Sequence, residues 1–155
     1  MALQIGDKAP SFQLFNTDKQ SVFLDDYAEK NLVILFFPLA FTGVCTTELC
    51  NMRDDIAAYK NLEANVVAIS VDTIFTLAKF KAEQNLNFPL LSDFNKETAT
   101  AYDAIYDEFV LGMKGVAKRS AFVVDGKGII QYAEVLASAG DLPNFEAIKA
   151  TLASL

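Results

Sequence analysis

The sequence of 155 residues contains no histidine. This absence excludes Ser-His-Asp triads, Cys-His dyads and metal sites built on imidazole. The chain has two cysteines, Cys45 and Cys50, and two cysteines alone do not form a zinc site. We therefore expect neither a zinc site nor a metal site built on histidine. A nucleophilic cysteine in this chain would be activated by a helix terminus and by Lys or Arg.

Long hydrophobic runs and cysteine pairs are also scarce. No apolar run reaches about 18 residues, so we expect no transmembrane helix. Residues Met1–Pro10 lack the basic stretch and the following apolar stretch of a signal peptide. Two cysteines in a chain of this size do not form the disulfide framework of a secreted protein. The sequence therefore predicts a reducing, cytoplasmic compartment.

Basic residues are outnumbered by acidic ones, since 13 Lys and Arg stand against 20 Asp and Glu, which gives a net charge of −7. Polyanions repel such a chain, so we expect neither nucleic acid nor a membrane surface as a partner. The length fits a single domain, residues 1–155, and a hydrophobic content of 52% supports a well-buried sheet.

One stretch combines a core strand, a turn and a helix. Leu32–Phe37 is an apolar run typical of a buried parallel strand, and Pro38 ends it because proline has no N–H for a strand ladder. Thr42 follows in the turn. After Cys45, apolar residues recur with helical spacing at Leu49, Met52, Ile56 and Tyr59. Cys45 thus lies in or near a first helical turn, where free N–H groups and the helix dipole stabilise a thiolate, the reactive form.

The remaining elements are predicted from periodicity and turn residues. Further strands are expected at Ser11–Phe15 and Ser21–Phe23, which form an N-terminal β-hairpin, and at Val66–Val71, Phe88–Leu91, Ala121–Val124 and Ile129–Ala133. Helices are expected at Cys45–Lys60, Ile74–Gln84, Glu97–Tyr102 and, beginning at Asp141 and Pro143, across Leu142–Leu155. Pro89 places its strand at an edge or at a strand start. This order predicts an α/β, thioredoxin-like fold with a central mixed β-sheet flanked by helices.

Three residues of the strand–turn–helix stretch form the motif Pro-x-x-x-Thr-x-x-Cys, namely Pro38, Thr42 and Cys45. This motif resembles the active-site motif of the peroxiredoxins. Glu48, three residues beyond the cysteine, and Arg119, directly before a late strand, match the same pattern. The resemblance covers nearly the whole chain, and its three fixed positions stand in the strand–turn–helix context that the motif requires.

Two finer resemblances concern branches of that family. The string Phe36–Cys45 resembles the alkyl hydroperoxide reductase E-type branch. Cys50, five residues after Cys45, resembles the resolving cysteine of the bacterioferritin-comigratory (PrxQ) type. By that resemblance, Cys50 forms a disulfide with the oxidised Cys45, and a thioredoxin- or glutaredoxin-like protein reduces it again.

The resemblance implies a thiol-dependent peroxidase that reduces H2O2, alkyl hydroperoxides or peroxynitrite without a prosthetic group. The Cys45 thiolate attacks one peroxide oxygen and becomes a sulfenic acid. Thr42 donates its hydroxyl to the reacting oxygens, and Arg119 supplies N–H donors and a permanent charge. Glu48 accepts a hydrogen bond from Arg119 and fixes its direction, whereas Pro38 shields the thiolate.

The role of Cys50 leaves alternatives open. Five residues along a helix turn a side chain by about 500° and raise it by about 7.5 Å, so Cys45 and Cys50 point some 140° apart. A disulfide requires Cα atoms within about 7 Å and converging Cβ atoms, so the helix must unwind around Cys45–Met52 in each cycle. Otherwise Cys50 is a small core residue, and the enzyme is a one-cysteine peroxidase resolved by an external thiol.

The segment Ala104–Lys118 has no helix or strand period, although it contains Phe109, Val110, Leu111 and Met113. These residues form an apolar collar for the peroxide beside Ala40 and Phe41, a dimer patch or a locally buried loop. Because the family commonly dimerises through loops near its active site, we favour a homodimer.

Three other classes compete with a peroxidase. A thiol–disulfide oxidoreductase would carry a CxxC pair, but Cys45 and Cys50 are farther apart. A non-enzymatic thioredoxin-like binding module would not need Thr42 or Arg119. A metal or heme chaperone is disfavoured by the lack of histidine.

Overall fold

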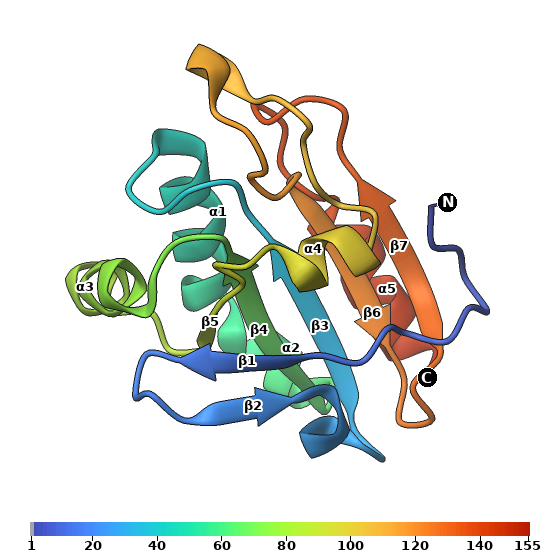
Figure 1. Ribbon diagram of the computed structural model, residues 1–155. Helices are drawn as coiled ribbons and strands as arrows, with labels where there is room; N and C mark the ends of the chain where they lie inside the picture. Colours follow the sequence, from blue (N-terminus) through green and yellow to red (C-terminus); the bar gives the residue numbers. More distant parts are fainter. Residues whose placement is uncertain (1) are drawn as a thin grey trace.

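The computed structural model describes residues 2–155, over which seven strands form one sheet in the order β2-β1-β5-β4-β3-β6-β7 (Figure 1). The strands are β1 (Gln13–Asn16), β2 (Ser21–Phe23), β3 (Asn31–Phe36), β4 (Ala64–Ser70), β5 (Leu90–Ser92), β6 (Ser120–Val124) and β7 (Ile130–Val135). The α-helices are α1 (Gly43–Asp54), α2 (Ile56–Asn61), α3 (Ile74–Gln84), α4 (Glu97–Ala101) and α5 (Phe145–Ala153). Short 3-10 helices occupy Leu24–Tyr27 and Val110–Gly112.

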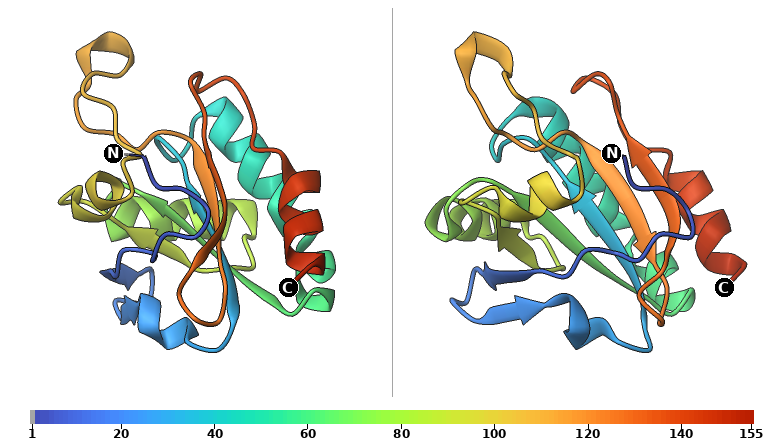
Figure 2. Two further views of the ribbon diagram at one scale, coloured as in Figure 1. Left: turned by 90° about the vertical axis from the view of Figure 1, so that its right-hand side faces the viewer. Right: turned by 45° about the vertical axis from the view of Figure 1, so that its right-hand side comes forward.

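Strand β3 lies inside the sheet, parallel to β4 and antiparallel to β6. Its side chains alternate between two cores because successive residues of a strand point to opposite faces. Val33 and Leu35 join the core covered by α1, α2, α3 and α5, whereas Ile34 joins the core covered by α4 and the N-terminal segment. Figure 2 shows these two layers on either side of the sheet. The predicted mixed sheet with helices on both faces is confirmed.

Several predicted elements need correction at their ends. The helix expected at Cys45–Lys60 is split at Asp55 into α1 and α2, and the Asp55 N–H bonds to the carbonyls of Asn51 and Met52 in the last turn of α1. The closing helix begins at Phe145, not at Asp141 and Pro143, since the Asn144 side chain caps it by accepting from the Ala147 N–H at 3.0 Å.

The short strand after Pro89 lies inside the sheet. Strand β5 pairs in parallel with β4 and antiparallel with β1, so the edge alternative is wrong and the strand-start alternative is confirmed. Proline is tolerated because it precedes the first strand residue, Leu90, and its carbonyl still accepts from the Ala68 N–H. Among residues 2–155, no helix has the length and apolar character needed to cross a membrane.

The segment Ala104–Lys118 projects from the end of the sheet where α1 begins (Figures 1 and 2). An isolated bridge between Ile105 and Ala117 closes its base, and the rings of Tyr106 and Phe109 stack at 5.0 Å. Leu111 at the tip is 96% exposed. A locally buried loop is therefore wrong for the tip, which points its apolar side chains into solvent.

Candidate active site

A short loop joins the end of β3 to the start of α1 and sets the position of the motif residues. The Phe37 N–H still bonds to β4, through the Ile69 carbonyl, and Pro38 then ends the pairing and is buried. The Ala40 N–H donates to an Asp72 carboxylate oxygen at 2.8 Å, and that oxygen also accepts from the Ser70 hydroxyl at 2.6 Å. These bonds fix the loop to the end of β4, and the chain then enters α1.

Cys45 lies in the first turn of α1 and is only 1% exposed. Thr42 is the N-cap residue, and the helical ladder begins where its carbonyl accepts from the Thr46 N–H at 2.9 Å. The Cys45 N–H precedes this bond and therefore has no acceptor within the helix. Its free donor and the positive end of the helix dipole both favour negative charge on the sulfur.

Arg119 is buried beside that sulfur, at 2% exposure. It directly precedes β6, whose first residue, Ser120, pairs with Phe36 at the end of β3, and this pairing brings it next to α1. Its Nη2 donates to the Cys45 Sγ at 3.3 Å, and its Nη1 donates to Glu48 Oε1 at 2.6 Å. Two nitrogens of one planar guanidinium thus donate to a thiol and to a carboxylate, whose relative positions are fixed by this contact.

Glu48 completes this cluster from α1 and is fully buried. Burial raises the pKa of Glu48 to about 7, although the charge and hydrogen bond of Arg119 oppose the shift. Its Oε2 atom has no hydrogen-bond partner within residues 2–155. The site therefore places two acidic groups, the Cys45 thiol and Glu48, around one buried cation.

The Thr42 hydroxyl is not free to donate to a peroxide, which differs from the sequence-based expectation. It donates to the Leu39 carbonyl at 2.8 Å, within the same loop. Its oxygen keeps lone pairs, so it can accept a hydrogen bond from a substrate O–H. Thr42 itself is exposed at the mouth of the loop.

Cys50 stands apart from this cluster. It is half-buried on α1, and its Sγ donates to Gln84 Oε1 of α3 at 3.4 Å. Cys45 and Cys50 are both free thiols within one continuous helix, so they point to different sides of α1. The structure brings Cys45, Glu48 and Arg119 together, and it leaves Cys50 outside.

Comparison with known proteins decides the family, because a family model for AhpC/TSA proteins matches residues 5–133. The chain belongs to the AhpC/TSA family. A putative peroxiredoxin of Mycobacterium tuberculosis is 41% identical over 131 residues, covering 83% of either chain. Alkyl hydroperoxide reductase E of the same organism is 38% identical over 136 residues, covering 86% of either chain.

A solved structure supports the same assignment for this AhpC/TSA protein. The crystal structure of peroxidoxin BcpB from Mycobacterium tuberculosis superposes with a TM-score of 0.86 at 26% identity, covering 99% of this chain and 98% of that one. The peroxiredoxin resemblance and the thioredoxin-like fold are thereby confirmed. The chain is an enzyme of the thiol-dependent peroxidase class.

Two contributors to the site of this AhpC/TSA protein were not predicted from the sequence. The Ala139 carbonyl accepts from Arg119 Nε at 3.2 Å and from Nη2 at 3.0 Å. A backbone carbonyl in a loop has no sequence signal, so this contact could not be found without the fold. Asp72 lies two residues beyond the end of the buried strand β4, a position at which polar residues of α/β proteins often serve a site, so its role had a weak signal.

Proposed function

We propose that Cys45 is the peroxidatic thiol and that it reduces H2O2, alkyl hydroperoxides or peroxynitrite. The contact between Arg119 Nη2 and the Cys45 Sγ, at 3.3 Å in the first turn of α1, carries this proposal. A buried cation and a helix N-terminus on one sulfur favour the thiolate, which is the attacking species.

The reaction between the Cys45 thiolate and the peroxide needs no cofactor. The thiolate of Cys45 attacks the terminal oxygen of the hydroperoxide, the O–O bond breaks, and the second oxygen leaves and takes a proton from water. The products are a cysteine sulfenic acid and water from H2O2, an alcohol from an alkyl hydroperoxide or nitrite from peroxynitrite. Negative charge spreads over both oxygens in the transition state, where Arg119 and the Cys45 N–H are donors. The Thr42 oxygen accepts from the substrate O–H, and Pro38 shields the sulfur on the buried side.

Glu48 is a positioning residue in this proposal. Arg119 Nη1 donates to Glu48 at 2.6 Å, and its Nε donates to the Ala139 carbonyl. Two nitrogens of the guanidinium are thus bonded to groups that take no part in the reaction. This leaves Nη2 aimed at the sulfur. Binding the cation from two sides limits its movement during the reaction, which is what preorganised stabilisation requires.

We propose Cys50 as the resolving thiol, with a thioredoxin- or glutaredoxin-like protein as the reductant of the resulting disulfide. Because the two cysteines lie on different sides of α1, its first turns must unwind for the disulfide to form. The low cysteine content supports a reducing, cytoplasmic compartment, where such a reductant works.

Mass measurement after one turnover tests both cysteines. Fully reduced protein receives one equivalent of H2O2 and is analysed by intact mass. Wild type is expected to lose about 2 Da through a disulfide, and Cys50→Ser to gain about 16 Da through a sulfenic acid. A gain of about 16 Da in both would make this a one-cysteine peroxidase. No rapid change in either would contradict the proposal.

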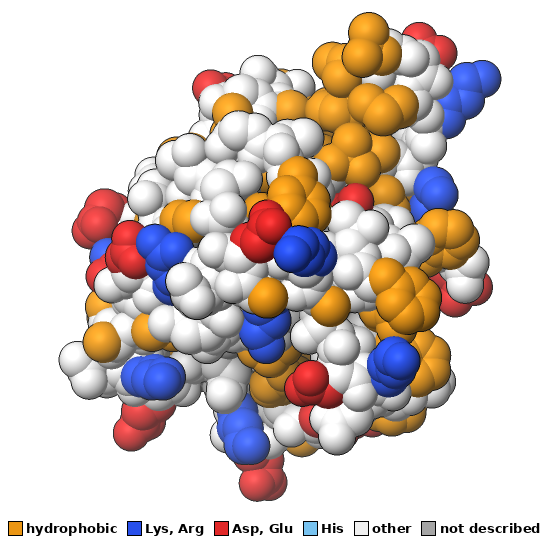
Figure 3. All heavy atoms as spheres, turned by 90° about the vertical axis from the view of Figure 1, so that its left-hand side faces the viewer, with side chains coloured by type: hydrophobic (Ala, Val, Ile, Leu, Met, Phe, Trp, Pro, Cys, Tyr) orange, Lys and Arg blue, Asp and Glu red, His pale blue; other side chains and the backbone are white. Residues whose placement is uncertain are grey.

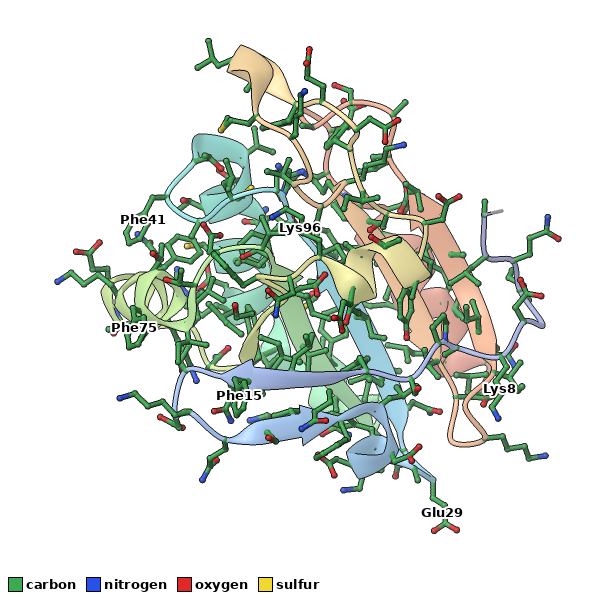
Figure 4. The ribbon with its side chains drawn as sticks, in the orientation of Figure 1. Lys8, Phe15, Glu29, Phe41, Phe75 and Lys96 are labelled. Atoms are coloured by element: carbon green, nitrogen blue, oxygen red, sulfur yellow. The ribbon has the colours of Figure 1, made fainter. Side chains whose placement is uncertain are left out.

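We further propose that a second copy of the chain covers the projecting loop. Figure 3 shows hydrophobic side chains gathered on this projection, and Val110 and Leu111 are 59% and 96% exposed. Phe41 and Phe75, labelled in Figure 4, are also exposed on the side of α3, at 48% and 70%. Exposed apolar side chains in such a concentration indicate a protein interface.

The dimer is tested by Leu111→Asp, with Ile5→Asp as a matched control because Ile5 is also exposed but lies in the N-terminal segment. A buried, unpaired charge is expected to weaken association about 30-fold or more. Sedimentation velocity should find wild type and Ile5→Asp as dimers and Leu111→Asp as a monomer. A monomeric wild type, or equal behaviour of the two variants, would refute this interface.

A further inference from the structure

A cavity of about 620 Å³ lies at the end of the sheet away from Cys45. Three segments line it, namely residues 8–11, residues 24–32 and residues 124–128. Strand β3 runs from this cavity, which Leu32 lines, to the active-site loop after Phe36, about 13 Å further along at roughly 3.3 Å per strand residue. Figure 4 shows Lys8 and Glu29 at this end, away from Phe41. The cavity is therefore separate from the catalytic cysteine.

Backbone hydrogen bonds hold the walls of this cavity together. The Ala9 N–H donates to the Gly128 carbonyl at 2.9 Å, and the Glu29 N–H donates to the Gly126 carbonyl at 2.9 Å. Gly126 lies so close to the Glu29 backbone that a Cβ atom on it would be 3.0 Å from two Glu29 carbons. The cavity is thus formed without a ligand, as small-molecule sites usually are, and its volume falls within their usual range of about 300–1,000 Å³.

Each of the three segments contributes one lysine to the lining, namely Lys8, Lys30 and Lys127. Within residues 2–155, none of these side chains pairs with a carboxylate or lies over an aromatic ring. This lack of partners stands out in a chain with 20 acidic and only 13 basic residues. Three unpaired ammonium groups from separate parts of the chain therefore surround one cavity.

Two carboxylates line the same cavity, and one of them is already used by the protein. Asp125 Oδ1 accepts from the N–H groups of Lys127 and Ile129 at 2.9 and 3.0 Å, and its Oδ2 accepts from Gln131 Nε2 at 2.8 Å. These bonds stabilise the turn between β6 and β7. Asp25 is an exposed carboxylate. With three lysines against two aspartates, the lining keeps a net positive charge.

The carboxylates next to the lining do not neutralise the lysines either. Asp7 Oδ2 accepts from the Gln4 N–H at 2.8 Å, and Asp26 Oδ2 accepts from the Phe23 N–H at 2.9 Å. Glu29 is exposed, and Figure 4 shows its side chain pointing away from the protein. An anion that enters the cavity would therefore meet ammonium groups that no carboxylate of the described chain binds.

Apolar surface and a free hydroxyl lie among the lysines. Pro10, Leu24 and Tyr27 are half-buried in the lining. Burial raises the pKa of Tyr27, with a smaller contribution from the charge of Asp26, so the hydroxyl stays protonated and can donate a hydrogen bond. The phenol ring of Tyr27 offers a flat face on which a planar group can stack.

We propose that this cavity binds a small organic phosphate with a flat ring, such as a nucleoside diphosphate, its phosphates among the three lysines and its ring against Tyr27. A phosphate has several acceptor oxygens and can bond to ammonium groups from different directions, whereas one carboxylate needs fewer cations. The net charge of −7 repels long polyanions, so the ligand is a small molecule and not a nucleic acid. This binding function is independent of the proposed peroxidase reaction.

Calorimetric titration of the reduced protein with ADP, without divalent metal ions, tests the site. Adenosine and pyrophosphate are titrated separately as the two parts of the probe. We expect ADP to bind at least about 10-fold more tightly than either part, because its ring and phosphates bind together. Binding should weaken as NaCl rises from about 20 to about 200 mM. No ADP binding at about 5 mM, or pyrophosphate binding as tight as that of ADP, would overturn the proposal.

The role of the lysines is tested by the triple variant Lys8→Gln/Lys30→Gln/Lys127→Gln. The matched control Lys60→Gln/Lys81→Gln/Lys114→Gln removes the same charge from lysines outside the cavity. We expect the first variant to bind ADP about 10-fold more weakly or worse, and the control to stay within about twofold of wild type. Equal weakening in both variants would mean that only the net charge matters, and it would refute the site.

NMR of isotope-labelled protein locates the bound probe. ADP should shift backbone amide signals within residues 8–11, 24–32 and 124–128, and it should leave those of residues 43–48 around Cys45 unchanged. Tyr27→Leu keeps an apolar side chain without the ring, so it should bind pyrophosphate like wild type and ADP about 5-fold more weakly. Shifts confined to residues 43–48, or spread evenly over the surface, would overturn the inference.

Discussion

Replacing Arg119 with methionine is expected to slow the oxidation of Cys45 by H2O2 about 100- to 1,000-fold, the usual effect of removing one fixed donor to a developing anion. Arg119 is 2% exposed and donates to the Cys45 Sγ at 3.3 Å, so no water can readily take its place. The rate is measured by single-turnover kinetics with reduced protein. Arg119→Lys should recover only part of the loss, because an ammonium lacks the fork that also reaches Glu48.

A matched control separates this role from general loss of charge. Lys118→Met removes the neighbouring cation, which lies over the Tyr106 ring at 5.7 Å and not at the sulfur, and it should leave the rate unchanged. Because Arg119→Met leaves Glu48 buried without its partner, the fold is also checked in the double variant Arg119→Met/Glu48→Gln, in which both charges of this buried ion pair are removed. A folded double variant that reacts at the wild-type rate would contradict the role of Arg119.

Glu48 is expected to make the reduced protein less stable as pH rises. Its pKa is about 7 in the folded state, above the ordinary value of 4.5, because burial disfavours the charged form. Between these values the folded state binds more protons than the unfolded state, so stability is greatest below pH 4.5 as far as this group is concerned. The free energy of unfolding then falls as pH rises to about 7, by about 3 kcal/mol at most.

Glu48→Gln removes this titration while an amide oxygen can still accept from Arg119. Urea unfolding of reduced protein, from about pH 5 to about pH 8, should show a falling free energy of unfolding in wild type and a flatter curve in Glu48→Gln. Parallel curves would mean that Glu48 stays ionised at all these pH values, paired with Arg119.

The sequence was informative wherever a local pattern had one structural solution. The apolar run before Pro38 and the helical spacing after Cys45 placed the thiol at a helix start, and the hairpin between β6 and β7 followed from Asp125–Gly128. The partnership of Arg119 and Glu48 was predicted from the family resemblance, since no local rule links residues so far apart in the chain.

Other features depend on contacts that no sequence pattern encodes. The break at Asp55 separates α1 from α2 although the apolar spacing continues through it, and the Asp55 carboxylate pairs with Lys149 of α5 at 2.6 Å. The Thr42 hydroxyl bonds to Leu39 because of the loop conformation, which Asp72 stabilises from the segment after β4. Such tertiary contacts decide between local alternatives that the sequence leaves equally possible.

The central claim, that Cys45 is the peroxidatic thiol, is tested most directly by the rate at which each thiol consumes H2O2. Fully reduced wild type, Cys45→Ser and Cys50→Ser are each mixed with one equivalent of H2O2, and the remaining peroxide is followed with time. Wild type and Cys50→Ser should consume the peroxide rapidly, and Cys45→Ser should be no faster than the same protein unfolded in urea. Rapid consumption by Cys45→Ser, or a wild type no faster than its unfolded form, would contradict the claim.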